Sequence, residues 1–72
     1  MVAKGMKMIV YKDYQDLKEP EGLGLLMEKV RDGLPFTGKD GETYSYQRWE
    51  VLFLTGKYKG RRAHRNFRLP AL

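Results

Sequence analysis

The chain has no cysteine, one histidine, one serine and one tryptophan among its 72 residues. Without cysteine it has no disulfides and no thiolate zinc site, and with a single histidine we expect no metal centre. No apolar run approaches the roughly 20 residues of a membrane helix. Residues 1–10 also lack the long hydrophobic stretch of a signal peptide. We therefore expect a soluble intracellular protein, in cytoplasm or nucleus, without cofactor, metal or membrane.

Acidic residues are absent from the end of the chain. All nine lie between Asp13 and Glu50. Residues 51–72 carry a charge of +6, whereas residues 1–50, with eight basic and nine acidic side chains, sum to −1. Such a concentrated basic patch attracts polyanions and gains free energy by releasing their counterions. A solvated tail is the alternative, but Phe53, Tyr58 and Phe67 are interleaved with the charges, which favours a folded nucleic-acid interface.

The length predicts one small domain over residues 1–72, in which only a limited core can be buried. We expect residues 1–5 to be disordered and Met6 to Tyr11, a short apolar and β-branched run, to form a first strand. Residues 12–22 contain Pro20 and predict a connection with at most one helical turn, around Tyr14 to Leu17.

Two helices and a hairpin are predicted next. Leu23, Leu26, Met27 and Val30 recur at i, i+3, i+4 and i+7, which favours a helix over residues 23–31 that ends at Gly33. Residues 38–41 contain an Asp-Gly pair typical of a hairpin turn.

A second helix is favoured over residues 47–54, with Ser45 as its cap. A strand is the alternative there, because periodicity cannot classify the apolar run at 51–54. The predicted fold is α+β, with a β-hairpin, two short helices and a basic loop at 57–68. The expected core consists of Ile9, Leu26, Met27, Val30, Trp49, Leu52 and Phe53.

No catalytic constellation is evident. Ser45 and His64 are a conceivable nucleophile and base, but nothing in the sequence brings them together. The acidic pairs at 13/16 and 40/42 lie in turn-forming segments, where acids are common for local hydrogen bonding. We predict that the protein is not an enzyme and has no catalytic residues.

A partial family resemblance lies in the second half of the chain. Tyr44-Ser45 is followed by Trp49-Glu50 and, after an arginine-rich stretch, by Arg65-Asn66-Phe67-Arg68. This order resembles the later part of a SAND domain, in which a short helix leads to an arginine-rich loop and a Lys-Asp/Asn-Trp-Lys signature that contacts DNA. The resemblance covers residues 40–69, with Phe67 where that family has tryptophan. It implies a DNA-binding domain.

A second resemblance competes with the first. Pro35, Gly41-Glu42-Thr43-Tyr44, Glu50 and Thr55-Gly56-Lys57 are spaced similarly to residues of the U-box, a zinc-free ubiquitin-ligase module. This likeness covers residues 35–57. It implies that a conjugating enzyme docks on the surface around Leu34 and Phe36.

A third alternative is a small viral or regulatory inhibitor that binds a host protein. Tyrosine and arginine are favoured in protein interfaces, and Tyr11, Tyr14 and Tyr58 together with the basic loop would serve such a contact. Under this alternative the partner is a protein, and binding is largely indifferent to salt.

The favoured function is non-enzymatic binding of nucleic acid, with duplex DNA as the expected partner and transcription regulation as the setting. The predicted site consists of Lys57, Lys59, Arg61, Arg62, His64, Arg65, Asn66 and Arg68. We expect the lysines and arginines to contact phosphates, and His64 and Asn66 to reach base edges. Phe67 and Tyr58 are expected to anchor the loop to the core.

Overall fold

The structure is a computed structural model that describes residues 2–13 and 16–70. These residues contain no helix, so the predicted α+β class is wrong and the fold is all-β. Five strands form one sheet: β1 (Lys7–Asp13), β2 (Asp16–Asp32), β3 (Phe36–Thr37), β4 (Thr43–Phe53) and β5 (Arg62–Pro70).

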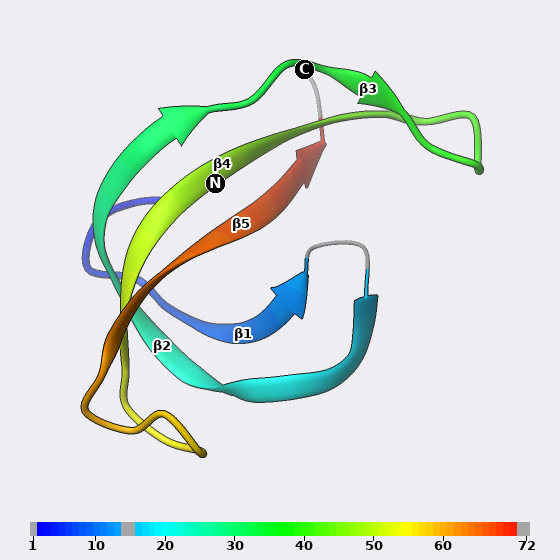
Figure 1. The fold of residues 1–72 in the computed structure, drawn as a ribbon. Coiled ribbons are helices and arrows are strands. Elements are labelled where there is room, and N and C mark those ends of the chain that lie inside the picture. The colour runs from blue at the N-terminus through cyan, green and yellow to red at the C-terminus, as the bar shows by residue number, and fades with distance from the viewer. Residues whose placement is uncertain (1, 14–15, 71–72) are drawn as a thin grey trace.

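Strand β4 is the centre of the sheet. Its C-terminal part pairs with β2 and its first residues pair with β3, while β5 runs along its other edge. β1 pairs with the first part of β2, and all of these pairings are antiparallel. The sheet curls strongly, so that β1 approaches β5 (Figure 1). The curl gives the sheet a concave inner face and a convex outer face, and successive residues alternate between the two.

The core fills the inner face. It consists of six buried side chains: Val10, Leu26, Trp49, Val51, Phe53 and Phe67. Each fully buried Val, Leu or Phe contributes about 1.5–3 kcal/mol relative to its exposed state. Gly24 of β2 is also buried, and a Cβ there would lie 2.3 Å from Val51 Cγ1 and 2.6 Å from Val10 Cγ2. A side chain at this position would therefore overlap core residues of both β1 and β4.

The helix predicted over residues 23–31 is part of β2. The pairing of β2 with β4 is interrupted twice, between Leu26 and Glu28 and between Lys29 and Arg31. Each bulge adds one residue to β2 and shifts the alternation of its side chains by one position. The two added residues are Met27 and Val30, so the bulges impose on a strand the apolar spacing that is typical of a helix.

The helix predicted over residues 47–54 is strand β4, as the alternative interpretation had it. Trp49, Val51 and Phe53 point into the core at a period of two. Glu50 and Leu52, which lie between them, are on the outer face. Because Leu52 is apolar although it faces outward, residues 51–54 form an unbroken apolar run, and the alternation of a strand cannot be recognised in the sequence. The residue expected to cap the helix, Ser45, pairs with Leu69 of β5.

The core prediction is correct for Leu26, Trp49 and Phe53 but wrong for Ile9 and Val30, whose side chains are 52% and 46% exposed. The remaining two predicted core residues, Met27 and Leu52, are half-buried.

The first strand and the hairpin are confirmed. β1 covers most of the run from Met6 to Tyr11, and the Asp-Gly turn joins β3 to β4, with Gly41 at a φ of +82°. Lys4 and Gly5 form a turn, and the Gly5 N–H donates to Leu26 O at 2.8 Å. The helical turn predicted around Tyr14 lies partly outside the described residues, and β2 begins at Asp16.

Candidate nucleic-acid interface

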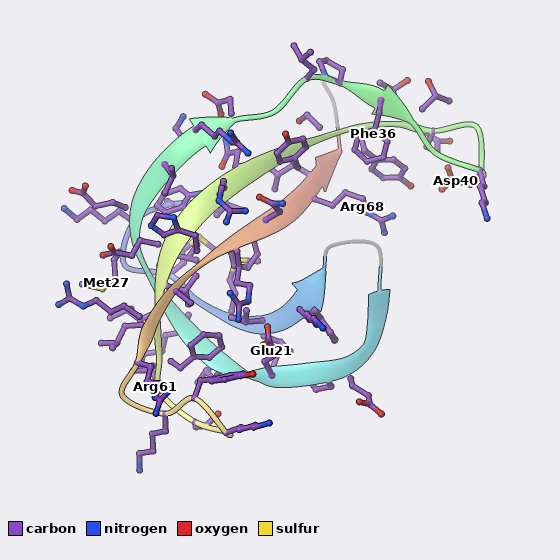
Figure 2. The ribbon with its side chains drawn as sticks, in the orientation of Figure 1. Glu21, Met27, Phe36, Asp40, Arg61 and Arg68 are labelled. Carbon is purple, nitrogen blue, oxygen red and sulfur yellow. The ribbon has the colours of Figure 1, made fainter. Side chains whose placement is uncertain are left out.

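The predicted basic site is split between three places. One turn, between β4 and β5, carries Lys57, Lys59 and Arg61. The outer face of β5 carries Arg62, His64, Asn66 and Arg68, and the inner face carries Arg65. Figure 2 shows Arg61 and Arg68 at opposite ends of the sheet. From Arg62 to Arg68 the strand extends about 20 Å, because each residue of a strand rises about 3.3 Å.

Arg65 does not belong to the candidate interface, because it forms an ion pair on the concave side. Its Nε and Nη2 donate to the two carboxylate oxygens of Glu21 at 2.7 and 3.0 Å. The Arg65 and Glu21 side chains are 21% and 11% exposed, and Figure 2 shows Glu21 directed from β2 into the concave side. The hydrogen bonds from Arg65 hold the pKa of Glu21 below its ordinary value. Arg65 also lies over the Phe53 ring at 5.6 Å.

The backbone beside Glu21 explains why this acid reaches β5. Gly56 has a φ of +86°, and a Cβ there would lie 2.2 Å from Glu21 O. Leu23 N–H donates to Thr55 Oγ1 at 2.9 Å. Residues 21–23 of β2 are thus held against the turn that follows β4, and Glu21 is placed next to Arg65.

The turn between β4 and β5 is closed by hydrogen bonds. Gly60 N–H donates to Phe53 O at 2.8 Å and Arg61 N–H to Tyr58 O at 2.9 Å. Tyr58 packs on the Phe53 ring with centroids 5.6 Å apart, and Phe67 lies in the core, so both have the anchoring role predicted for them. The three basic side chains of this turn, which we call the turn cluster, are exposed.

A second group of cations lies at the other end of the outer face. Arg31 of β2 is directly opposite Arg48 of β4, and Arg48 is directly opposite Asn66 of β5. Tyr46 is the partner of Arg68 in the next row. We call this surface the arginine face; its members are Arg31, Tyr46, Arg48, Asn66 and Arg68.

The electrostatics of the arginine face are unusual. Like charges directly opposite each other in a sheet are destabilising, yet neither Arg31 nor Arg48 forms an ion pair with another described residue. Arg48 Nη1 donates to Asn66 Oδ1 at 3.2 Å. This bond occupies the amide oxygen of Asn66, which was predicted to read a base edge. The arrangement leaves two adjacent positive charges that an anion would stabilise.

An acidic row separates the arginine face from the turn cluster. Glu28 of β2 is opposite Glu50 of β4, and Glu50 is opposite His64 of β5. Glu50 also lies 3.9 Å from Arg62 Nη1. His64 and Arg62 therefore face carboxylates. The acidic row therefore separates the turn cluster from the end of β5 that carries Asn66 and Arg68.

A pocket adjoins the arginine face at the β3–β4 hairpin. Its volume is about 530 Å³, and Phe36, Lys39, Asp40, Tyr44 and Arg68 are among its lining residues. The Phe36 and Tyr44 ring centroids are 6.0 Å apart, and the Arg68 guanidinium lies 4.6 Å from the Tyr44 centroid. Figure 2 shows Phe36 and Arg68 close together, although they come from opposite edges of β4.

Asp40 is held in place at the tip of this pocket. The Tyr44 hydroxyl donates to Asp40 Oδ2 at 2.6 Å, and Glu42 N–H donates to Oδ1 at 3.0 Å. The hydrogen bond from Tyr44, followed by that from Glu42, lowers the pKa of Asp40, and the same bond to Asp40 raises the pKa of Tyr44. Asp40 is thus a fixed carboxylate at neutral pH.

Tyr44, Tyr46 and the arginines at 31 and 48 were not predicted as site residues from the sequence, and Phe36 was named only for the surface implied by the U-box resemblance. Tyr44, Tyr46 and Arg48 alternate with other residues at a period of two, which is the signal of one strand face. The expectation of a helix in this region hid that signal. The surface implied by the U-box resemblance is divided here, since Leu34 is 84% exposed while Phe36 lines the pocket.

The described residues give little support to a catalytic pair, a metal site or a membrane-spanning helix. Ser45 and His64 lie on opposite faces of the β4–β5 ladder. Across residues 2–13 and 16–70 no group of three or more potential ligands is arranged to hold a metal ion, and no helix could cross a membrane. Comparison with protein families, curated proteins and solved structures finds no match to this chain.

Proposed function

We propose that this protein binds nucleic acid without catalysing a reaction, and that the arginine face is its interface. The observation that carries this proposal is the register of β2, β4 and β5, which sets Arg31 opposite Arg48 with Arg68 in the adjacent row. Phosphates of a nucleic-acid backbone would relieve the repulsion between the two opposed arginines. Arginine is also the side chain best suited to phosphate, because its donors form a planar fork.

A sheet surface is a reasonable nucleic-acid interface. The described residues offer no helix that could enter a major groove, whereas sheets with exposed aromatic side chains bind single strands by stacking bases. The aromatic residue Tyr46 lies opposite Arg68, in the row next to Arg31 and Arg48, and its ring covers Gly33, where a Cβ would lie 2.2 Å from Tyr46 Cε1. Within this surface, Asn66 serves to orient Arg48.

The test compares two double variants that remove the same charge. Arg31→Gln with Arg48→Gln alters the arginine face, and Lys57→Gln with Lys59→Gln alters the turn cluster. Affinity for an oligonucleotide is measured by fluorescence anisotropy at several salt concentrations. We expect the arginine variant to lower the slope of log affinity against log salt by about two units, since about one counterion is released per phosphate contact. The lysine variant should keep most of the slope.

Each other outcome has a definite meaning. If only the lysine variant loses its salt dependence, the interface is the turn cluster and the assignment to the arginine face is wrong. If the unaltered protein binds neither single-stranded nor duplex nucleic acid at low salt, the proposed function itself is wrong. Tryptophan fluorescence of Trp49, which is buried, checks that both variants are folded.

A protein-interaction module is the second candidate function, and one observation favours it. The outer face of β1, β2 and β4 carries an apolar group in which Ile9 is opposite Leu23, and Leu25 is opposite Leu52. Ile9 is 52% exposed, and clustered apolar surface often marks a protein contact. Ile9→Lys should abolish binding to a protein partner but leave nucleic-acid binding intact, and the partner's binding should be nearly insensitive to salt.

A further inference from the structure

The pocket beside the arginine face has a composition that suits a nucleobase. On the basis of the nucleic-acid binding proposed above, we infer that it receives one unpaired base of a single strand and prefers a base with an exocyclic amino group, such as cytosine. Its volume of about 530 Å³ lies within the range of ordinary small-molecule sites, which is about 300–1,000 Å³.

The aromatic side chains supply the stacking surface. Phe36 and Tyr44 are tilted by 36° with centroids 6.0 Å apart, and Arg68 lies over the Tyr44 ring. Unstacked bases bind to proteins by stacking on aromatic rings and on the planes of arginine side chains. A base within a duplex has both faces covered by its neighbours, so this surface is available only to an unpaired base.

The position of the pocket connects it to the backbone interface. Arg68 lines the pocket and belongs to the arginine face, and Lys39 lines the pocket from the β3–β4 turn. A strand whose phosphates lie along Arg31 and Arg48 can therefore place its next base against Phe36. Arg68 would then contact both the base and the adjacent phosphate.

Asp40 provides the base preference. An ionised carboxylate can only accept hydrogen bonds, at about four lone-pair sites, and Asp40 uses two of them for Tyr44 and Glu42. The remaining sites can accept from the N4 amino group of cytosine. Thymine has the O4 acceptor at the same place, which would repel the carboxylate.

The experiment compares three ten-residue DNA probes: single-stranded oligo(dC), single-stranded oligo(dT) and a mixed duplex. Phe36→Leu removes the aromatic face but keeps an apolar side chain. Leu34→Ala is the control, because Leu34 is an apolar neighbour that is 84% exposed and does not line the pocket. Asp40→Asn keeps the shape of the side chain and leaves one acceptor oxygen in place of the two that accept from Tyr44 and Glu42.

We expect Phe36→Leu to weaken single-strand binding about five- to hundredfold, which is the usual loss for one base stack, with the salt slope and duplex affinity unchanged. Leu34→Ala should behave as the unaltered protein does. The unaltered protein should bind oligo(dC) at least about fivefold more tightly than oligo(dT). In Asp40→Asn, the affinities for the two probes should be nearly equal.

The results distinguish a failure of the base pocket from a failure of the proposed function. If single strands bind with a steep salt dependence but Phe36→Leu binds them equally well, the base pocket is wrong while the proposed function stands. If oligo(dT) is preferred, the role of Asp40 is wrong. If no probe binds, both the pocket and the proposed function are wrong.

Discussion

Glu21→Gln should destabilise the protein at neutral pH, although it changes only one charge. The carboxylate accepts two hydrogen bonds from Arg65 and is 11% exposed. Exposed ion pairs contribute about 0–1 kcal/mol, whereas removing one partner of a fully buried pair costs about 3–5 kcal/mol. The pair lies between these limits and Gln keeps one acceptor for Arg65, so we expect a loss of about 2 kcal/mol in the free energy of unfolding.

The effect should depend on pH in a defined direction. Hydrogen bonds from Arg65 lower the pKa of Glu21 in the folded protein from its ordinary value of 4.5. The unfolded chain therefore binds more protons than the folded chain between the two pKa values, and stability rises with pH there. The contribution of Glu21 is fully present above about pH 4.5 and is lost as the pH falls through the lowered value. The difference between Glu21→Gln and the unaltered protein should thus shrink in acid.

Urea unfolding followed by the fluorescence of Trp49 measures both effects, since Trp49 is the only tryptophan and is buried. Asp32→Asn is the matched control: Asp32 pairs with Lys29 at 3.1 Å, but their side chains are 64% and 43% exposed, so we expect a change below about 0.5 kcal/mol. Our interpretation of Glu21 would be refuted by equal losses in the two variants, or by a loss for Glu21→Gln that stays constant from pH 7 to pH 3.

Two further variants test the core. Gly24→Ala should lower the free energy of unfolding by about 1–3 kcal/mol, because the added Cβ would overlap Val51 and Val10. An unchanged midpoint in chemical denaturation would contradict this and would show that the strands can move apart. Trp49→Ala should cost about 3–5 kcal/mol, enough to unfold most of so small a domain. The side chain is 5% exposed and its Nε1–H donates to Gln47 at 3.0 Å. Far-ultraviolet circular dichroism that matched the unaltered protein would contradict this expectation.

The sequence allowed prediction of the features of the fold that depend on local chemistry. The Asp-Gly turn at Gly41 requires a positive φ, and the apolar run from Met6 fits a strand whatever its partners are. The helix over residues 23–31 was wrong for a physical reason. Bulges at Met27 and Val30 depend on pairing with β4, a strand about 20 residues away, and local periodicity contains no information about that register.

The candidate site was predicted only in part for the same reason, because local sequence does not reveal which strands pair or which face a side chain occupies. Charge counting identified a basic end of the chain, but it assigned all its cations to one surface. Once residues 62–70 form a strand, neighbouring side chains must point to opposite faces, so Arg65 is directed inward while Arg68 stays outside. Phe36 and Arg31 come from segments that the charge pattern did not single out.

The position of each arginine in the sheet, and not its residue type, decides its role. Arg65 faces the concave side, where a lone charge would be costly, so its presence requires Glu21, the acid of β2 that is held beside it next to Gly56. Arg48 faces outward, opposite Arg31, where the cost of two like charges is reduced by water. A variant at Arg65 that lost nucleic-acid binding would therefore report on folding. Only variants that leave the Glu21 ion pair intact, such as Arg31→Gln with Arg48→Gln, can assign the interface.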